Sequence, residues 1–207
     1  MKLYLASGSP RRRELLTLAG IAFEIRPCND PEETTAVTPV QTVLDLSSHK
    51  AHAVFDDLKN SAAENNFAVL GADTIVVISD DGVGDNAPNG SAVIIGKPQD
   101  DEDARQILKK LSGRTHEVFT GVCILVNENG KTRKKTFYER TAVTMYPITD
   151  AELDDYLASG EHMDKAGAYA IQGLAVKFVR KVTGDYSNIV GLPVARVYHE
   201  LSKLHVL

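Results

Sequence analysis

Cysteine is scarce in this chain of 207 residues, which contains only Cys28 and Cys123. The two cysteines are far apart in the sequence and form neither a metal-binding nor a redox motif. Two free thiols in a reducing compartment are therefore expected, with a single structural disulfide as the alternative.

Long apolar runs and excess positive charge are also missing. No stretch is long and apolar enough to span a bilayer, and the first residues lack the apolar segment of a secretion signal. A cytoplasmic protein without a membrane partner is therefore expected. The 28 acidic and 23 basic residues leave a formal net charge of -5, which argues against nucleic acid as the main partner. A basic pocket for a small polyanion remains compatible with this charge.

Several familiar signatures are absent as well. The sequence contains no Walker-type phosphate loop, no nucleophile elbow and no dinucleotide-binding glycine fingerprint. It also contains no internal repeat and no linker rich in Pro, Gly or Ser. With 43% hydrophobic and 25% charged residues, the composition is that of a globular protein. A single domain over residues 1–207 is therefore expected.

The spacing of apolar residues predicts an α/β fold, with a mixed, twisted sheet flanked by helices and two lobes around a cleft. Strands are expected at residues 3–6, 21–26, 67–79, 117–126, 132–146 and 176–182. Helices are expected at residues 10–19, 40–58, 101–111, 150–158 and 193–204. Residues 80–91 are expected to form a polar surface loop or a hairpin excursion, within a long loop that runs to residue 95.

An unusual cluster of positive charge follows the first predicted strand. Ser9 and Pro10 are favourable residues for a helix start. Arg11, Arg12 and Arg13 then occupy the first turn, where the helix dipole favours negative charge. A bound polyanion, held by backbone N–H groups and arginines, would resolve this conflict. The alternative is a solvated arginine face on a surface helix.

A carboxylate interrupts the apolar strand predicted at residues 67–79. Asp73 would be costly to bury unpaired, and the small residues Gly71 and Ala72 before it leave room for a ligand. Asp73 is therefore a candidate general base for a water molecule, or a ligand of a divalent cation. The alternative is a salt bridge at the end of a strand. Thr74 adds a second polar group at the same place, which favours a functional role.

Other polar candidates carry both functional and structural interpretations. Lys97 in a Gly-Lys-Pro turn suits a phosphate, or is a solvated turn residue. Lys50, taken alone, indicates a helical side chain that extends past apolar surface to water. Glu32 and Glu33 in an acidic loop are either metal ligands or solvated carboxylates. Gln172, in a Gly- and Ala-rich stretch, carries an amide able to recognise the edge of a base.

Three histidines complete the set of candidates. His116 follows a predicted helix, and local hydrogen bonds there are favoured over a catalytic role. His49 and His52 are three residues apart on one face of a predicted helix, a spacing compatible with zinc. No nearby carboxylate or cysteine completes a zinc-binding set, so this interpretation is disfavoured.

Six stretches together resemble the Maf family of nucleoside triphosphate pyrophosphatases. They follow the family's order and run through nearly the whole chain. The stretches are Ser7-Gly8-Ser9-Pro10-Arg11-Arg12, Gly71-Ala72-Asp73-Thr74, Gly96-Lys97-Pro98, Ser112-Gly113-Arg114-Thr115-His116, Asp164 to Gly173, and Asn188 to Pro193. The resemblance implies a fold related to the inosine triphosphate pyrophosphatases, with a cleft between two lobes, commonly in a homodimer. It also implies cleavage between the α- and β-phosphates of a nucleotide, with Mg²⁺ or Mn²⁺ as cofactor.

The same resemblance implies roles for individual residues. Asp73 would be the catalytic base and, with Glu32, a metal ligand; the choice between Glu32 and Glu33 stays open. The implied phosphate contacts are Ser7, Arg12, Lys50 and Lys97. The implied determinants of substrate choice are Arg11, Thr74 and Gln172, as in the subfamily that acts on dTTP, UTP and related pyrimidine nucleotides. The alternative function is a nucleotide-binding regulator of cell division without turnover.

Overall fold

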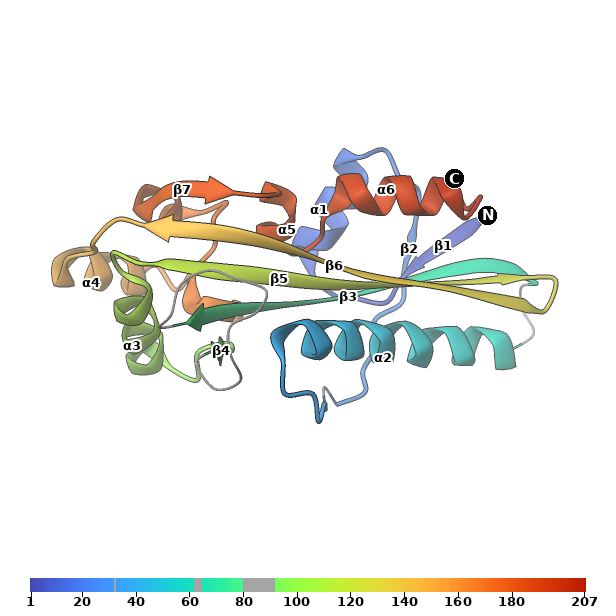
Figure 1. Cartoon of the computed structure of the whole chain (residues 1–207), viewed down its shortest axis with the longest axis horizontal. Helices are drawn as coiled ribbons and strands as arrows, with labels where there is room; N and C mark the ends of the chain where they lie inside the picture. The colour runs from blue at the N-terminus through green and yellow to red at the C-terminus, as the bar shows by residue number, and fades with distance from the viewer. Residues whose placement is uncertain (32, 62–64, 80–91) are drawn as a thin grey trace. The chain divides into compact units, whose positions relative to one another are not determined.

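The computed structural model describes residues 1–31, 33–61, 65–79 and 92–207 (Figure 1). Within these residues, seven strands form one sheet in the order β2-β1-β3-β5-β6-β7, and β4 pairs with β3 beside this path. Strand β1 runs parallel to β2 and β3, whereas the pairs β3–β4 and β6–β7 are antiparallel. The predicted mixed sheet with flanking helices is therefore confirmed.

The bounds of the elements mostly follow the predicted ranges. The strands are β1 (Lys2–Leu5), β2 (Glu24–Ile25), β3 (Asn66–Ser79), β4 (Ala92–Ile95), β5 (Thr115–Glu128), β6 (Lys131–Met145) and β7 (Val179–Thr183). The helices are α1 (Pro10–Leu18), α2 (Pro39–Asn60), α3 (Asp101–Leu111), α4 (Asp150–Ala158), α5 (Tyr186–Val190) and α6 (Val194–Lys203), with short 3₁₀ helices η1 (Ala166–Ala168) and η2 (Leu174–Phe178). No helix in the described ranges combines the length and the apolar character needed to cross a membrane.

The chain divides into two compact units. Unit 1 comprises Met1–Asp73, Thr120–Glu139 and Gly191–Leu207, and unit 2 comprises Thr74–Phe119 and Arg140–Val190. The long strands β3, β5 and β6 each contribute residues to both units.

In unit 1, helix α2 packs on one face of the sheet and α6 on the other (Figure 1). The core beneath α2 includes Phe55 and Phe67, whose ring centroids are 5.2 Å apart, and Ala51, Val54 and Leu125. Each fully buried phenylalanine or leucine contributes about 1.5–3 kcal/mol by leaving water. The apolar positions of α2 thus fix which face of this helix meets the sheet.

Two glycines allow α2 to approach the sheet closely. A Cβ atom on Gly121 of β5 would lie 2.1 Å from the Val43 carbonyl oxygen, and one on Gly71 of β3 would lie 2.4 Å from that of Ser47. Real Cβ atoms never come this close to backbone oxygens, so only glycine is compatible with the contact at either position. The two glycines thus set the short distance between the α2 backbone and the strands β3 and β5.

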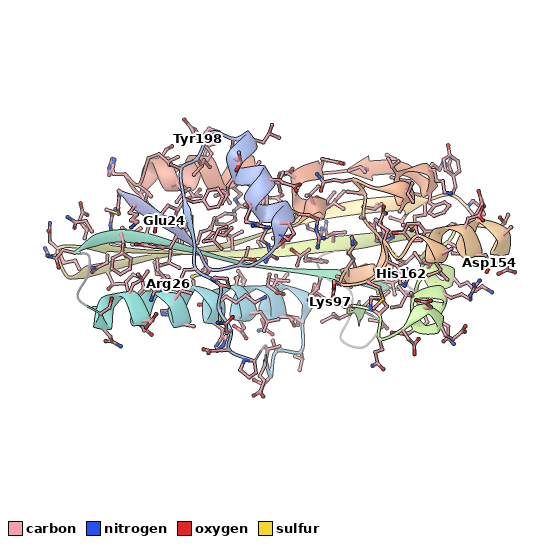
Figure 2. The ribbon with its side chains drawn as sticks, turned by 180° about the vertical axis from the view of Figure 1, so that it is seen from behind. Glu24, Arg26, Lys97, Asp154, His162 and Tyr198 are labelled. Atoms are coloured by element: carbon pink, nitrogen blue, oxygen red, sulfur yellow. The ribbon has the colours of Figure 1, made fainter. Side chains whose placement is uncertain are left out.

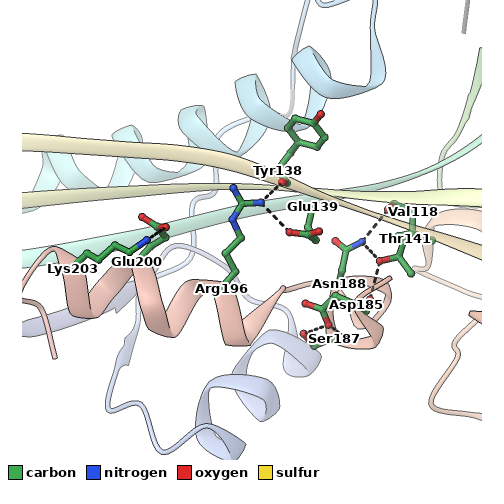
Figure 3. Close-up of polar contacts among 10 residues, drawn as sticks. All are labelled: Val118, Tyr138, Glu139, Thr141, Asp185, Ser187, Asn188, Arg196, Glu200 and Lys203. Carbon is green, nitrogen blue, oxygen red and sulfur yellow. Dashed lines mark hydrogen bonds and ion pairs between the residues drawn. The ribbon is translucent and has the colours of Figure 1, made fainter. Parts of the chain in front are cut away.

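Helix α6 is joined to β6 by an arginine, as Figure 3 shows. Arg196 Nη1 donates to the Tyr138 carbonyl oxygen at 2.8 Å and to Glu139 Oε2 at 2.9 Å. The same guanidinium lies over the Phe137 ring, 4.5 Å from its centroid. One side chain thus fixes the helix to its strand through three contacts.

In unit 2, charged pairs join α3 to α4. Lys109 Nζ lies 2.7 Å from Asp150 Oδ1, and Arg105 pairs with Asp154. A capping box begins α4: the Thr149 hydroxyl accepts from the Glu152 N–H, and the Glu152 carboxylate accepts from the Thr149 N–H. The capping box depends only on local sequence, which contains Thr and Glu three residues apart.

A buried asparagine holds α5 against the sheet of unit 2 (Figure 3). Asn188 Nδ2 donates to the Val118 carbonyl oxygen at 3.0 Å and to Thr141 Oγ1 at 2.9 Å. Thr141 Oγ1 in turn donates to the Asp185 carbonyl oxygen at 2.9 Å. Asn188, at the start of the last recognised stretch, therefore has a structural role: its buried amide joins α5 to the sheet.

Three predicted ranges were wrong, and one short helix was missed. The strand expected at 21–26 is only Glu24–Ile25, because the Ile21 N–H donates to Leu16 and completes the end of α1. Residues 92–95, expected in the loop, form β4 against β3; the rest of that predicted loop, 80–91, lies outside the described residues. The strand expected at 176–182 begins only at Val179, after η2. Helix α5 was not predicted, since five residues are too few for a periodic pattern.

Candidate active site

A buried ion pair in unit 1 joins Asp73 to Lys50. Lys50 Nζ donates to Asp73 Oδ1 at 2.7 Å, and the two side chains are only 11% and 9% exposed. Helix α2 supplies Lys50 and strand β3 supplies Asp73. Because Gly71 lets the helix lie close to the strand, the ammonium reaches the carboxylate without leaving the interior.

This contact corrects the prediction for Lys50. The side chain does not extend to water but is buried against Asp73. Asp73 forms the salt bridge of the structural alternative, although it lies within β3 and not at the end of the strand. Its role as a base or as a cation ligand stays a prediction. The ammonium stabilises the negative charge of the carboxylate where little water is present. An ionised carboxylate of this kind is able to accept a proton or to bind a cation.

The arginine-rich turn places one guanidinium in the interior of unit 1. Arg12 is buried; its Nε donates to the Gly191 carbonyl oxygen at 2.9 Å, and its Nη1 donates to Ser7 Oγ at 2.9 Å. Ser7 Oγ also accepts from the Ser9 N–H at 3.3 Å. Ser7 thus orients Arg12. The first turn of α1 contains no acidic residue, so no carboxylate in that turn offsets the positive charge of its arginines.

The predicted helix start was partly right. Ser9 occupies the N-cap position and Pro10 the first helical position of α1, but the Ser9 side chain makes no capping hydrogen bond. The turn is instead organised by Ser7, which receives both the Ser9 N–H and the Arg12 guanidinium. Arg11 is half-buried on the same helix. The first turn of α1 is thus built around Arg12.

The other predicted site residues are distributed as follows. Glu32 lies outside the described residues, and Glu33 is exposed. Thr74, Lys97 and Gln172 belong to unit 2, where Thr74 is half-buried and the other two are exposed. Lys97 follows β4 and is labelled in Figure 2. Within unit 1, the structure therefore brings together Ser7 with Arg12, and Lys50 with Asp73.

Two of the recognised stretches are neighbours within unit 2. The Gly167 N–H donates to the Gly96 carbonyl oxygen at 3.1 Å, which joins the stretch from 164 to 173 to the Gly-Lys-Pro turn. Gly167 itself lies against Val76 of β3. The hydrogen bond from Gly167 thus holds the turn that carries Lys97.

A carboxylate that sequence reasoning missed holds the backbone after Gln172. Glu161 Oε2 accepts from the Leu174 N–H at 2.9 Å, and its Oε1 accepts from the Tyr156 hydroxyl at 3.1 Å. The carboxylate occupies the space that a Cβ atom on Gly173 would need. No local pattern indicates this contact, because an acidic residue just after a helix is ordinarily solvated. Glu161 positions the segment that carries Gln172.

His116 is a structural residue of unit 2. Its ring is 1% exposed, and Nε2 is 2.8 Å from the Tyr169 hydroxyl. The structural interpretation is thus supported, although the hydrogen-bond partner is 53 residues away instead of local. Burial lowers the pKa of His116 from 6.5 to about 4, so the imidazole is neutral at pH 7.

This burial predicts a pH-dependent stability. Because the pKa is lower in the folded than in the unfolded state, the unfolded state binds the additional proton between about pH 6.5 and 4. Stability is therefore lost as the pH falls through this window, by up to ~3 kcal/mol. We expect His116→Gln to reduce that slope in urea unfolding at pH 7.5 and pH 4.5. His52→Gln, at a half-buried position, is the control and should retain the wild-type slope. An equal loss of slope in both variants would contradict the assignment of the pH dependence to His116.

The two side-chain arrangements of unit 1 specify a class of protein. Unit 1 of this α/β fold holds a buried, ion-paired carboxylate and a buried guanidinium at a helix start, groups that are typical of proteins with charged ligands. Comparison with known proteins makes the class specific: the chain belongs to the family of Maf-like proteins, whose family model matches residues 2–204. The family predicted from the six stretches is therefore confirmed.

Curated relatives span nearly the whole chain. A dTTP/UTP pyrophosphatase of Agathobacter rectalis is 41% identical over 213 residues, covering 99% of this chain and 98% of the relative. A dTTP/UTP pyrophosphatase of Bacillus thuringiensis subsp. konkukian is 44% identical over 209 residues, covering 99% and 96%. Among solved structures, a HAM1 protein from Coxiella burnetii is 13% identical with a TM-score of 0.45, covering 98% and 99% of the two chains. That overlap is too loose to support an argument.

Proposed function

We propose that the protein hydrolyses dTTP and UTP to the nucleoside monophosphate and pyrophosphate. The observation that carries the proposal is the buried Lys50–Asp73 pair, a protected carboxylate in a chain that has a buried arginine at a helix start. Full-length relatives that are 40–44% identical and bear the name dTTP/UTP pyrophosphatase support the same activity.

Asp73 acts in this proposal as the general base. Its carboxylate takes a proton from a water molecule, whose oxygen bonds to the α-phosphorus while the bond to the bridging oxygen breaks. The electron pair of that bond leaves with pyrophosphate. Lys50 holds the carboxylate in its orientation before the reaction, and Arg12 offsets the negative charge of the phosphates. This scheme needs no covalent intermediate.

The described residues fit a hard divalent cation, Mg²⁺ or Mn²⁺. Magnesium is commonly held by one or two carboxylates together with the substrate's phosphates. Asp73 supplies one such carboxylate, whose Oδ1 is bonded to Lys50. We propose Asp73 as a ligand; Glu32, which lies outside the described residues, stays a prediction. When bound, the cation would supply positive charge to the phosphate oxygens.

For unit 2, Lys97 is proposed as a phosphate contact and Gln172 as a determinant of base choice. Both side chains are exposed and are therefore accessible to a ligand. A hydrogen-bonding amide discriminates strongly, because an unsuitable base leaves its polar groups unpaired. Arg11 and Thr74 are proposed as further determinants of specificity. A homodimer in the cytoplasm completes the proposal.

A nucleotide panel with product identification tests the function. We expect release of pyrophosphate, not orthophosphate, from dTTP and UTP, with kcat/KM above the values for CTP, GTP and 7-methyl-GTP. EDTA should abolish turnover, because the phosphate charge would lose its cation. Nucleotide binding without product would favour the non-turnover regulator, and orthophosphate would indicate attack at the terminal phosphate. A preference for a purine would overturn the proposed substrate.

The same panel on Gln172→Leu tests base recognition separately. We expect the preference for dTTP and UTP over CTP to decrease by about 10-fold or more, which is the scale of one lost polar discrimination. Lys177→Leu, at another exposed position of unit 2, is the control. An unchanged preference in Gln172→Leu would remove this residue from the specificity site.

A further inference from the structure

Three side chains of different chemistry converge in unit 1, outside the Lys50–Asp73 pair. The Cys28 thiol, the Asp30 carboxylate and the His49 imidazole each place one ligand atom within 4.8 Å of the other two. His49 Nε2 lies 3.9 Å from Asp30 Oδ2. Cys28 is half-buried, whereas the Asp30 and His49 side chains are 58% and 44% exposed. The cluster is thus open to an ion from solvent.

The three residues come from two segments that independent contacts hold together. Arg26, labelled in Figure 2, forms an ion pair with Asp57 of α2 at 2.5 Å. Its backbone N–H donates to the Leu5 carbonyl oxygen. Cys28 packs against the apolar core beneath α2. His49 projects from α2 itself. The cysteine and the histidine are thereby positioned by the fold, without help from an ion.

We propose that Cys28, Asp30 and His49 form a zinc-binding site. A tetrahedral zinc ion with Zn–N and Zn–O near 2.1 Å and Zn–S near 2.3 Å separates its ligand atoms by about 3.4–3.6 Å. The 3.9 Å between His49 Nε2 and Asp30 Oδ2 closes by about half an ångström, and the separations of the set, all within 4.8 Å, close by at most about 1.2 Å. Rotations of the exposed Asp30 and His49 side chains cover such distances. Water completes the fourth position.

The donor set selects zinc over the hard cations of nucleotide chemistry. Thiolate and imidazole ligands favour zinc, whereas Mg²⁺ prefers oxygen ligands only. On coordination the Cys28 thiol releases its proton to solvent, and its sulfur binds the ion instead. One thiolate and one carboxylate then balance the two positive charges of zinc, with His49 neutral. The ligand charges thus neutralise the charge of the ion.

This site differs from the zinc interpretation that the sequence first offered. The spacing of His49 and His52 suggested that the two imidazoles bind zinc together. In the structure, however, His52 Nε2 lies 3.4 Å from the Lys134 ammonium nitrogen and contacts that residue instead. The structure pairs His49 with Cys28 and Asp30, which lie well before it in the chain and reach it only through the fold. Zinc would fasten the segment after β2 to helix α2, one residue before Lys50.

Titration of the whole protein with Co²⁺ as a spectroscopic substitute, and with zinc in competition with a chromogenic chelator, tests the site. The wild type should bind one equivalent, with a thiolate-to-cobalt charge-transfer band and the intense visible bands of tetrahedral cobalt. We expect Cys28→Ser and His49→Gln each to weaken zinc binding by about 10²-fold, and the charge-transfer band to vanish in Cys28→Ser. His52→Gln, three residues along the same helix, should bind as the wild type does.

Circular dichroism of each variant separates loss of a ligand from loss of the fold. The proposal is overturned if wild-type protein gives no charge-transfer band, or if His52→Gln weakens binding as much as His49→Gln. Binding no tighter than that of the unfolded chain would show an adventitious ion only. None of these measurements depends on pyrophosphate release, so they test the zinc site independently of the proposed function.

Discussion

Asp73→Asn is expected to lower kcat for dTTP by about 10²-fold or more, while KM and the fold change little. The substitution replaces one carboxylate oxygen by an amide nitrogen of nearly the same size. The amide oxygen is able to accept the Lys50 hydrogen bond that Asp73 Oδ1 accepts at 2.7 Å. It is not able to take a proton from water, so the chemical step loses its base.

The control for this variant is Asp150→Asn. Asp150 pairs with Lys109 at the same 2.7 Å, but its side chain is 75% exposed. The two substitutions therefore remove the same charge from the same kind of ion pair, one buried and one at the surface. Asp150→Asn should retain wild-type kcat. If Asp73→Asn also retains it, the carboxylate is not the base, and proton transfer has to be assigned to another group.

The sequence predicted those parts of the site that depend on local chemistry. Asp73 was identifiable because a carboxylate in an apolar strand is costly unless it is paired. Arg12 was identifiable because arginines at a helix start oppose the dipole. The capping box of α4 and the turn at Asn129, with its φ of 52°, follow from short-range preferences.

The parts that could not be predicted depend on contacts between distant segments. Lys50 was expected to reach water, because a helical pattern does not show that a strand carboxylate lies within 2.7 Å. The Gly191 carbonyl that accepts from Arg12 is 179 residues further along the chain. His116 and Tyr169 are 53 residues apart. In each case the residue type was noticed, but its partner is determined by tertiary packing.

Gly121→Ala is expected to lower the free energy of unfolding by more than about 3 kcal/mol, because overpacking costs 1–3 kcal/mol even where side chains give way. Here the obstacle is backbone: the added Cβ would lie 2.1 Å from the Val43 carbonyl oxygen and 2.9 Å from the Leu44 nitrogen. Helix α2 has to move away from β5, and its apolar face then loses contact with the core. The melting temperature should fall by roughly 6–12 °C.

Gly96→Ala is the matched control, because a Cβ atom at Gly96 would meet nothing within 4 Å. It should melt within about 2 °C of the wild type, as surface substitutions usually do. Gly71→Ala, with its clash at 2.4 Å against Ser47, should resemble Gly121→Ala. Because α2 also carries Lys50, both clashing variants should lose turnover in any fraction that stays folded. Wild-type stability in Gly121→Ala would show that α2 does not approach β5 as closely as the structure places it, and the position of Lys50 beside Asp73 would then lose its geometric basis.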